Sequence, residues 1–540
     1  MLLALVTPPP VKPSEPGLSA HAAAMVLRGL GVDAVAVDAS IGWHRFVLDP
    51  ERLAGARVRA TSSGSTGRRA APDPRAPFKN HRAYTDRRVY TSAVNELERS
   101  LKVVGHPYPA LRLGIASVSL SGGARLESSA TLAELSSTAG PFDAYYEQEL
   151  IPLLRSFGAT HVGVSLTFQF QAPAAFRLAA LLARDAPDIR RVLGGPLVDC
   201  WLAAGFALEG APFERFHEVS PGGRDDMERL AEKLRRSERP TLAMTSKGPL
   251  AVPFEEAPWE DYLSPAPVVP AALGRGCYWR RCTFCPDHVH PPHDPCRRPE
   301  LESWLLTVAA RFPTGAMLHL TDSALPPGHL RHIAEVVRRE RLPIQWHGFV
   351  RPERRFTDRG LMRELAEGGC AMLQVGVETA SPRLIELLGK GTTADTVDRV
   401  LGAAAEEGIS VQAYLLFGLP TETDDDREMT LAMIERHAAG VLAVNSALLN
   451  LPKGSPMHRR PDDFDITEVV PFHRSTDLSL YDDFRCGPSH PRVEARRWLD
   501  RRFFKSTAVR AIAGGLRTPF KANHLCFLGA RGRQPPAASR

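Results

Sequence analysis

The sequence predicts an α/β protein with two main domains. The first is a Rossmann-like doubly wound sheet, and the second is a partial (β/α)6 TIM-like barrel followed by a mostly helical C-terminal extension. Three observations support this prediction. Short apolar runs alternate with segments of helical spacing in two separate stretches. A polar stretch with Pro and Gly lies between them. At 540 residues, the chain is too long for one ordinary core.

The domain boundaries are placed where this pattern changes. Residues 1–213 are predicted to form the sheet domain and 264–455 the barrel, with a linker at 214–263. Residues 456–540 form the extension, and its end at 531–540 has the composition of a disordered tail.

Composition and charge fit a globular protein, with 44% apolar and 24% charged residues. The net charge of +6 is small for this length. We interpret the arginine-rich segments 224–239 and 492–502 as solvated helix faces, so nucleic acid is not an expected partner. No apolar run reaches the roughly 18 residues that a membrane-spanning helix needs, so no membrane contact is expected.

The opening residues 1–7 are apolar but lack a basic leader and a cleavage site, which predicts a buried strand instead of a signal peptide. Without export, the expected compartment is the reducing cytoplasm. The eight cysteines are then predicted to be free thiols or metal ligands, not disulfides.

In the first domain, a strand at 2–6, a helix at 19–28 and a strand at 32–37 predict a right-handed βαβ unit. The pattern returns later with helices at 145–157 and 174–184 and strands at 161–166 and 192–194. Sheets of this type bind ligands at the carboxyl ends of their strands.

The barrel domain is predicted to contain six strands joined by helices. The strands are expected at 268–273, 316–320, 344–349, 372–377, 411–417 and 442–448. The helices are expected at 301–311, 330–340, 358–367, 382–388, 393–407 and 425–438. Alternation of this kind implies parallel strands, and chemistry in such barrels lies at their carboxyl ends.

Three cysteines follow the first barrel strand within nine residues: Cys277, Cys282 and Cys285. Thiolates are soft ligands that suit iron-sulfur clusters or zinc. Three of them, with one position open, would hold a [4Fe-4S] cluster with one iron left for a small molecule. The spacing therefore predicts a metal centre at the carboxyl end of this strand.

A structural zinc site is the alternative for these cysteines. Its fourth ligand would be Cys296 or one of three histidines, His288, His290 and His293. A structural zinc knuckle normally stands on its own short hairpins, whereas this loop opens a long alternation of strands and helices. This context favours the iron-sulfur cluster.

The cysteine segment resembles the cluster loop of the radical S-adenosylmethionine (radical SAM) enzymes. In that family, three cysteines hold the cluster and an aromatic residue, here Phe284, precedes the third. The commonest family spacing has three residues between the first two cysteines, and this chain has four. A longer first gap, often with a Gly-Cys-Tyr-Trp opening, occurs in subfamilies of the same superfamily.

Polar residues also follow the other barrel strands, and the resemblance gives them roles in binding SAM. Asp322 stands where a family Gly-Gly-Glu segment hydrogen-bonds the amino group, although aspartate replaces glutamate here. Arg351 and Glu378 lie where side chains reach the carboxylate and ribose. The turn containing Gly418 and Pro420 matches the one that approaches the adenine. Taken singly, each is equally well explained by a strand becoming polar where it surfaces.

Two further features of the second half receive simpler interpretations. The Lys390-Gly391-Thr392 segment also recurs in this class, and we interpret it as a turn. Cys486 and Cys526 are too few and too scattered to predict an auxiliary cluster, so we interpret them as isolated buried thiols.

The first domain resembles the cobalamin-binding-like domain at the amino end of many radical SAM proteins. The resemblance rests on the Pro-rich turn after the first strand and on segments 162–167 and 193–196. An Asp-x-His-x-x-Gly run, whose histidine coordinates cobalt in the best-known cobalamin domains, is missing. The alternative is a degenerate Rossmann-like sheet that only covers the active site. His44, beside Trp43 and Phe46, is interpreted as a packed side chain and not as a substitute ligand.

The resemblance implies a radical SAM enzyme with a [4Fe-4S] cluster that cleaves SAM to a 5′-deoxyadenosyl radical. With cobalamin bound, the expected reaction is C-methylation of a peptide, as in peptide maturation, or of a small natural product. Cobalamin-independent rearrangement, cyclisation or oxidation is an alternative, and a zinc-stabilised, non-catalytic binding module is another. A reductant such as flavodoxin or ferredoxin is the expected protein partner.

Overall fold

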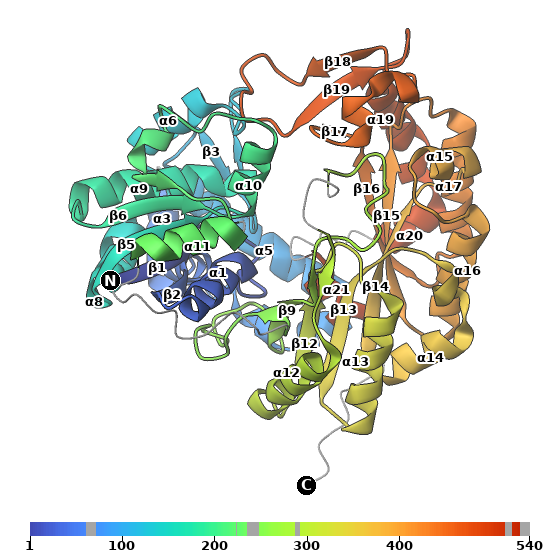
Figure 1. Ribbon diagram of the computed structural model, residues 1–540, viewed down its shortest axis with the longest axis horizontal. Helices are drawn as coiled ribbons and strands as arrows, with labels where there is room; N and C mark the ends of the chain where they lie inside the picture. The colour runs from blue at the N-terminus through green and yellow to red at the C-terminus, as the bar shows by residue number, and fades with distance from the viewer. Residues whose placement is uncertain (61–71, 223, 235–247, 287–291, 514–520, 530–540) are drawn as a thin grey trace. The chain divides into compact units, whose positions relative to one another are not determined.

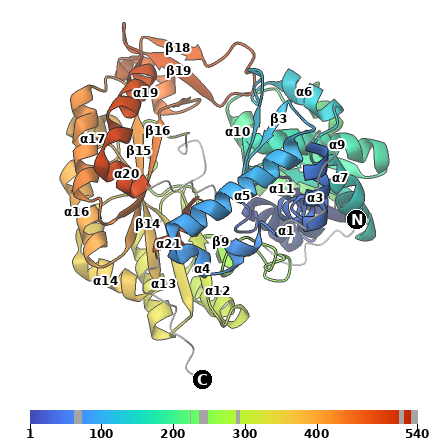
Figure 2. The same cartoon turned by 180° about the vertical axis from the view of Figure 1, so that it is seen from behind.

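The computed structural model describes residues 1–60, 72–222, 224–234, 248–286, 292–513 and 521–529. The chain divides into two compact units, shown from two sides in Figures 1 and 2. Unit 1 comprises Met1–Ser246, Ala251–Pro265 and His473–Ser479. Unit 2 comprises Lys247–Leu250, Ala266–Phe472 and Leu480–Arg540.

Unit 1 is built on a parallel sheet with the strand order β2-β1-β5-β6-β7. Its strands are β1 (Leu2–Thr7), β2 (Asp33–Asp38), β5 (Ala159–Ser165), β6 (Arg190–Gly194) and β7 (Glu218–Val219). The order reverses between β1 and β5, which makes this pair the topological switch point of a doubly wound sheet. The predicted Rossmann-like fold is therefore confirmed.

Helices cover this sheet because its central strands are apolar on both faces. Leu3 and Leu5 of β1 pack in one core with Ala24 and Leu27 of α1. The helices are α1 (Leu18–Gly29), α2 (Ala39–Val47), α3 (Pro50–Ala60), α4 (Arg82–Thr85), α5 (Arg87–Gly105), α6 (Ser129–Ser137), α7 (Asp143–Tyr145), α8 (Ile151–Ser156), α9 (Ala172–Asp185), α10 (Pro196–Ala203) and α11 (Arg224–Leu234). A π-helical turn at Tyr146–Leu150 precedes α8, and a short hairpin pairs β3 (Leu111–Leu113) with β4 (Val118–Leu120).

Unit 2 is built on a sheet with the order β16-β15-β14-β13-β12-β9, and the short β8 (Leu250–Ala251) lies beside β9. Six strands of this sheet pair in parallel: β9 (Val268–Ala272), β12 (Ala316–Leu320), β13 (Ile344–Val350), β14 (Cys370–Glu378), β15 (Ser410–Phe417) and β16 (Val441–Leu448). All six predicted strands are present. In the described residues β16 does not pair with β9, so the barrel is partial, as predicted.

Amphipathic helices lie along the outer face of this sheet (Figure 1). In α13, buried Leu330, Ile333, Ala334 and Val337 recur at helical spacing on one face. The helices that follow the barrel strands are α12 (Arg298–Arg311), α13 (Pro327–Arg339), α14 (Arg359–Glu367), α15 (Pro382–Leu387), α16 (Ala394–Glu406) and α17 (Asp424–Arg436).

The C-terminal extension contains helices α18 (Pro456–Arg459), α19 (Pro491–Arg501), α20 (Thr507–Ala513) and α21 (Lys521–Gly529). Its strands β18 (Glu468–Pro471) and β19 (Tyr481–Arg485) form an antiparallel sheet with β17 (Leu451–Pro452), which lies at the end of the predicted barrel range. The sequence did not predict this sheet. The predicted tail at 531–540 lies outside the described residues.

Helix α21 packs against the amino ends of the barrel strands. Its Leu525 and Cys526 share a core with Val268, Met317 and Met372, which lie near the starts of β9, β12 and β14. Cys526 is only 2% exposed, in agreement with the prediction of a buried thiol, whereas Cys486, predicted to be buried too, is half-buried. In the described residues, no helix combines the length and hydrophobicity needed to cross a bilayer.

Candidate functional site

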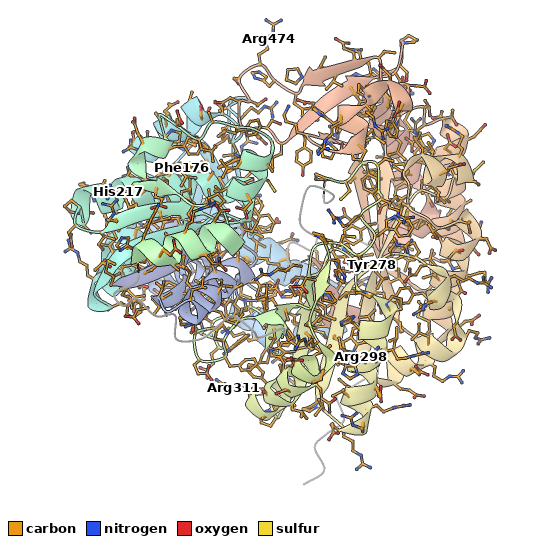
Figure 3. The ribbon with its side chains drawn as sticks, viewed as in Figure 1. Phe176, His217, Tyr278, Arg298, Arg311 and Arg474 are labelled. Atoms are coloured by element: carbon orange, nitrogen blue, oxygen red, sulfur yellow. The ribbon has the colours of Figure 1, made fainter. Side chains whose placement is uncertain are left out.

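The cysteine loop lies at the carboxyl end of β9. It follows the short strand β10 (Gly274–Arg275), which pairs with β11 (Asp294–Pro295) on the far side of the loop. Cys277, Cys282 and Cys285 are all half-buried. Tyr278, the neighbour of the first cysteine, is labelled in Figure 3. The sequence-predicted cysteines are thus on one short loop at the carboxyl edge of the sheet.

The donor set of this loop fits an iron-sulfur cluster in its chemistry, because three soft thiols lie on one loop. Burial raises the pKa of the Cys282 thiol to about 11, and the nearby Lys390 charge acts in the opposite direction. Among the described residues, no three His, Cys, Asp or Glu side chains are placed to hold a metal ion as they stand. The ligand role of the three cysteines therefore stays a prediction.

The alternative zinc ligands lie on the same stretch. His288 and His290 are outside the described residues. The His293 ring packs against Tyr278, with 6.1 Å between ring centroids. Cys296 is 6% exposed, and its backbone N–H donates to the Leu273 carbonyl. This hydrogen bond holds the backbone of the segment in place and does not involve the Cys296 thiol.

Asp322 lies just after β12 and is 6% exposed. Its Oδ2 accepts a hydrogen bond from the backbone N–H of Leu273, at the end of β9, at 2.8 Å. Burial raises the pKa of this carboxyl to about 6, while the backbone hydrogen bond acts in the opposite direction. Asp322 thus ties the start of the cysteine loop to the second barrel strand, and its expected contact with the SAM amino group stays a prediction.

Arg351 follows β13, and its guanidinium is committed largely to protein groups. Nη1 donates to the carbonyls of Lys390 and Gly391 at 2.8 and 3.3 Å, and Nη2 donates to Glu353 at 2.6 Å. The guanidinium carbon lies 4.0 Å from the centre of the Trp279 ring. Nε is buried and has no partner in the described residues. The expected contact of Arg351 with SAM stays a prediction.

Glu378 ends β14 with a φ of 59°, a left-handed conformation that is uncommon for a side chain of this type. Its Oε1 accepts a hydrogen bond from Lys390 Nζ at 2.9 Å. The same Nζ donates to the Gly376 carbonyl at 2.7 Å. A buried lysine therefore holds the carboxylate that the sequence placed near the SAM ribose.

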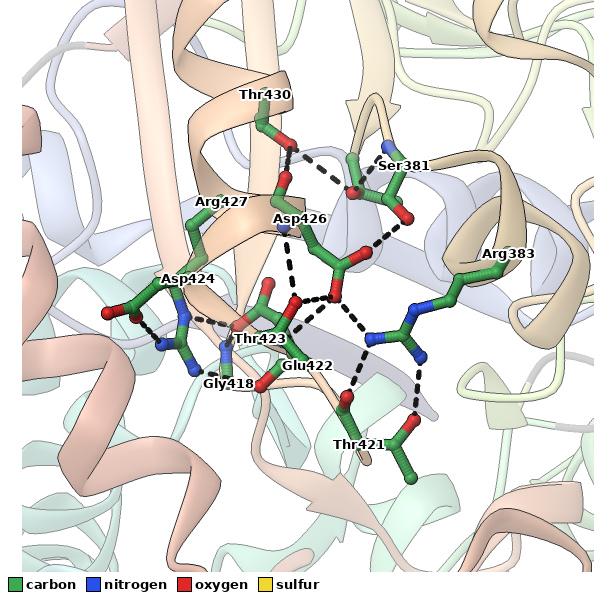
Figure 4. Close-up of polar contacts among 11 residues, drawn as sticks. Ser381, Arg383, Gly418, Thr421, Glu422, Thr423, Asp424, Asp426, Arg427 and Thr430 are labelled. Carbon is green, nitrogen blue, oxygen red and sulfur yellow. Dashed lines mark hydrogen bonds and ion pairs between the residues drawn. The ribbon is translucent and has the colours of Figure 1, made fainter.

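The turn after β15 is fixed by a buried ion pair (Figure 4). Glu422 Oε2 accepts from the Gly418 N–H at 2.6 Å and from Arg427 Nε at 3.0 Å. The side chains of Glu422 and Arg427 are only 1% and 3% exposed. Burial raises the pKa of Glu422 to about 7, and the Arg427 charge opposes this shift. Gly418 and Pro420, predicted to approach adenine, thus lie in a rigid turn.

A second set of polar groups surrounds this pair. Asp426 accepts hydrogen bonds from Ser381 and Arg383, and Arg383 also donates to Thr421. Figure 4 shows how these contacts join α15, the turn and the start of α17. This network was not predicted from the sequence. The sequence did contain one signal for it: Thr423 precedes three aspartates at the start of α17, and Asp426 completes a capping box with Thr423.

The inward face of the sheet carries a layer of His, Gln and Tyr side chains that was also not predicted from the sequence. His319 and His347 stack with ring centroids 4.7 Å apart. His347 Nδ1 lies 3.4 Å from Gln374 Oε1, and Gln374 Nε2 donates to the Tyr414 hydroxyl at 3.0 Å. His319 and Gln374 lie two residues after Met317 and Met372, which pack against α21. They therefore lie on the same face of β12 and β14 as those methionines.

In unit 1, the ends of β1 and β5 are joined by uncharged side chains. Ser19 contacts both Ser165 and Thr167 through hydroxyl pairs at 3.0 and 2.9 Å. Gln171 Nε2 donates to the Pro8 carbonyl at 2.7 Å. Thr7 is 1% exposed, and its hydroxyl has no partner in the described residues. These groups lie at the switch point, where sheets of this order bind ligands.

His44 is packed, as predicted. It is 1% exposed, and both ring nitrogens lie within hydrogen-bonding distance of backbone carbonyls, Ser40 at 2.8 Å and Ile115 at 2.9 Å. Burial lowers the pKa of this imidazole, and the hydrogen bonds to the Ser40 and Ile115 carbonyls act in the opposite direction. It has no nitrogen to offer to a metal in this arrangement.

The fold and site of unit 2 define an α/β enzyme domain with a cysteine loop and polar groups at the carboxyl ends of parallel strands. Residues 272–434 match the model of the radical SAM superfamily, so this part of the chain is a radical SAM domain. A [4Fe-4S] cluster and SAM are the cofactors that such a domain implies.

Two curated relatives match shorter stretches. An uncharacterized methyltransferase of Pyrococcus horikoshii is 29% identical over 100 residues, 18% of this chain and 21% of that protein. An uncharacterized protein of Methanopyrus kandleri is 27% identical over 119 residues, 22% of this chain and 23% of that protein. The matches thus span about a fifth of the length of these relatives.

Two solved structures of low sequence identity also resemble the chain. The cobalamin-dependent SAM radical enzyme OxsB, with aqua-cobalamin and SAM bound, has a TM-score of 0.48 and 17% identity, and the match covers 66% of this chain and 60% of OxsB. The radical SAM methyltransferase TsrM from Kitasatospora setae, with cobalamin and a [4Fe-4S] cluster bound, has a TM-score of 0.46 and 15% identity, over 85% of this chain and 77% of TsrM.

Proposed function

We propose that the protein is a radical SAM enzyme that methylates an unactivated carbon of a peptide or small natural product, with cobalamin held by unit 1. The observation that carries the proposal is the presence, in one chain, of two parallel sheets with distinct ligand edges. The sheet of unit 2 bears the cysteine loop at its carboxyl edge, and the sheet of unit 1 has a topological switch point between β1 and β5. The methyltransferase name of the Pyrococcus horikoshii relative supports the same reaction.

When bound, the cluster and SAM supply a 5′-deoxyadenosyl radical that abstracts hydrogen, and cobalamin supplies a methyl group. The protein's own groups bind and orient these cofactors. Cys277, Cys282 and Cys285 would hold the cluster. Glu378, held by Lys390, would accept from the ribose hydroxyls, and the turn at Gly418 would border the adenine.

The residues at the unit 1 switch point fit a large ligand held by hydrogen bonds. The buried Thr7 hydroxyl is unpartnered in the described residues, and an added Cβ at Gly195 would lie 2.5 Å from the Leu166 carbonyl oxygen. This close approach brings backbone groups to the edge of the sheet. No Asp-x-His-x-x-Gly run is present, so cobalamin would bind here without that histidine as a cobalt ligand.

The layer of His, Gln and Tyr side chains inside the barrel favours a substrate recognised through amide, hydroxyl or aromatic groups. His319, His347, Gln374 and Tyr414 carry hydrogen-bond donors and acceptors, and Phe349 packs against Tyr414 with ring centroids 4.6 Å apart. A peptide segment or a heteroaromatic natural product carries groups of this kind, whereas a phosphorylated substrate would call for cations.

Radical SAM chemistry without cobalamin, giving rearrangement, cyclisation or oxidation, is the second candidate. It is favoured by the missing Asp-x-His-x-x-Gly run and by the complete hydrogen bonding of His44. Titration of the purified protein with cobalamin, followed by visible absorption, separates the two candidates, since only the first requires saturable binding.

The decisive test is anaerobic incubation of the reconstituted full chain with SAM and a reductant, scored for 5′-deoxyadenosine. We expect the parent to contain iron and sulfide and to form this product. Cys282→Ala should lose it, and Cys486→Ala, which alters a half-buried cysteine outside the loop, should retain it. A parent that holds zinc without sulfide, or Cys282→Ala with parent activity, would overturn the proposal.

A further inference from the structure

The turn that follows α15 is hydrogen-bonded to the cysteine loop at three successive carbonyls. The Thr283 hydroxyl donates to the Leu387 carbonyl at 2.8 Å, and the Thr283 N–H donates to the Leu388 carbonyl at 3.0 Å. The Trp279 indole N–H donates to the Gly389 carbonyl at 2.9 Å. Because Cys282 lies between Trp279 and Thr283, these bonds fix the loop on both sides of a predicted cluster ligand.

The turn is shaped for this contact by two glycines with left-handed backbone. Gly389 has a φ of 61°, and an added Cβ would lie 2.5 Å from the Arg281 carbonyl oxygen. Gly391 has a φ of 62°, and an added Cβ would lie 2.1 Å from the Trp279 ring. The loop and the turn therefore approach so closely that side chains at these two positions would push them apart.

Lys390, between the two glycines, extends the contact to the ends of β13 and β14. Its backbone carbonyl accepts from Arg351, and its ammonium group donates to the Glu378 carboxylate and the Gly376 carbonyl. The residue is 4% exposed. A buried ammonium is stable only when it is paired and hydrogen-bonded, so these contacts hold Lys390 in one place.

From this geometry we infer that Lys390 is a positioning residue that couples the cysteine loop to the SAM-binding residues Glu378 and Arg351. It acts on them, and does not itself touch the reacting atoms. Without its charge, the Glu378 carboxylate would lose the cation beside it, and the strained β14 end would be free to relax. The inference rests on the proposed function only in taking SAM and the cluster as the cofactors.

The test compares full-chain variants at two lysines. Lys390→Met removes the charge, and Lys390→Arg keeps it. Lys453→Met is the matched control, because Lys453 also forms a partly buried ion pair but its partner is Asp482 and not Glu378. Two measurements are made: hydrogen exchange of the metal-free protein at Thr283, and SAM affinity of the reconstituted protein from the change in the electron paramagnetic resonance spectrum of the reduced cluster.

For Lys390→Met we expect at least tenfold faster exchange at the Thr283 amide and at least tenfold weaker SAM binding at unchanged iron content. Lys390→Arg should recover part of both, and Lys453→Met should match the parent. Parent-like exchange and SAM affinity in a folded Lys390→Met protein would overturn the inference.

Two further outcomes remain decisive. If Lys390→Met does not fold, Thr283→Val tests the same coupling, because it removes only the hydroxyl donor to Leu387. We expect it to weaken SAM binding in the same direction, and no change would again overturn the inference. If the parent forms no 5′-deoxyadenosine, the proposed function fails, whereas the exchange measurement on the metal-free protein still decides the role of Lys390.

Discussion

The carboxyl edges of the two parallel sheets are built from different chemical groups. The edge in unit 2 holds buried ion pairs, Lys390 with Glu378 and Arg427 with Glu422. It also holds backbone strain, because Glu378 and Thr421 have left-handed φ values of 59° and 60°. Both features cost free energy and persist only where the surrounding structure stabilises them.

In unit 1, the bridge between the ends of β1 and β5 consists of uncharged side chains, Ser19, Ser165, Thr167 and Gln171. The difference indicates two tasks. A charged, strained edge suits a small zwitterion such as SAM, whose amino and carboxylate groups need fixed partners. An uncharged bridge of this kind suits a larger ligand that binds through many hydrogen bonds and buried area.

Arg427→Met is expected to lower the free energy of unfolding more than any other substitution at the unit 2 edge. At about pH 8, above the raised pKa of Glu422, it leaves the Glu422 carboxylate, 1% exposed, without a cation, so the free energy of unfolding should fall by about 3–5 kcal/mol. Chemical denaturation of the full chain measures the change.

Arg436→Met is the matched control. Its partner Asp398 and the arginine itself are 36% and 58% exposed, and an exposed pair contributes about 0–1 kcal/mol. Equal losses in the two variants would show that the unit 2 edge is not held by its buried charge.

The stability of unit 2 should depend on pH through Glu422, whose pKa is raised to about 7 by burial. Between roughly pH 4.5 and 7 the native protein keeps this proton and the unfolded chain has lost it. The free energy of unfolding should therefore decrease as the pH rises through this window, by at most about 3 kcal/mol.

Glu422→Gln should remove this part of the pH dependence, because the amide has the same shape and does not titrate. Thermal unfolding of both proteins at several pH values measures the effect. An unchanged slope in the variant would assign the pH dependence to another group, such as Asp322, whose pKa is raised to about 6.

The parallel strands could be predicted because both faces of each strand are covered, so a run such as Ala316–Leu320 is nearly all apolar. The antiparallel β19 could not, because its Tyr481-Asp-Asp-Phe-Arg485 segment alternates exposed and buried positions over only five residues. A segment of that length with two adjacent acidic residues is typical of a loop when only the sequence is known.

The cysteine loop could be predicted because its residues are neighbours in the chain. The role of Lys390 could not, since its partners Gly376 and Glu378 are 14 and 12 residues away and the sequence alone predicted only a turn at this position. The same holds for His319 and His347, which meet only because β12 and β13 pair in register.

Gly391→Ala is a smaller perturbation of the charged edge. The new methyl group would meet the Trp279 ring at a φ of 62°, so we expect a loss of about 1–3 kcal/mol in unfolding free energy, together with reduced iron retention. Gly454→Ala is the control, because Gly454 has a φ of 78° but no atom within 4 Å of the added Cβ. If both variants keep their iron equally, close contact with the loop does not matter for the cluster.

Thr7→Val should have the smallest effect on stability and the most informative effect on unit 1. The buried Thr7 hydroxyl has no partner in the described part of the chain, so replacing it by a methyl group should leave the unfolding free energy unchanged or raise it by about 1 kcal/mol. If the unit 1 edge binds cobalamin through this hydroxyl, the same variant should bind cobalamin several-fold more weakly in the visible absorption titration. Thr7→Ser, which keeps the hydroxyl, should bind as the parent does. A Thr7→Val protein with parent affinity would remove this hydroxyl from the proposed site, and the contrast between a catalytic and a ligand-binding edge would then depend on Ser19, Thr167 and Gln171.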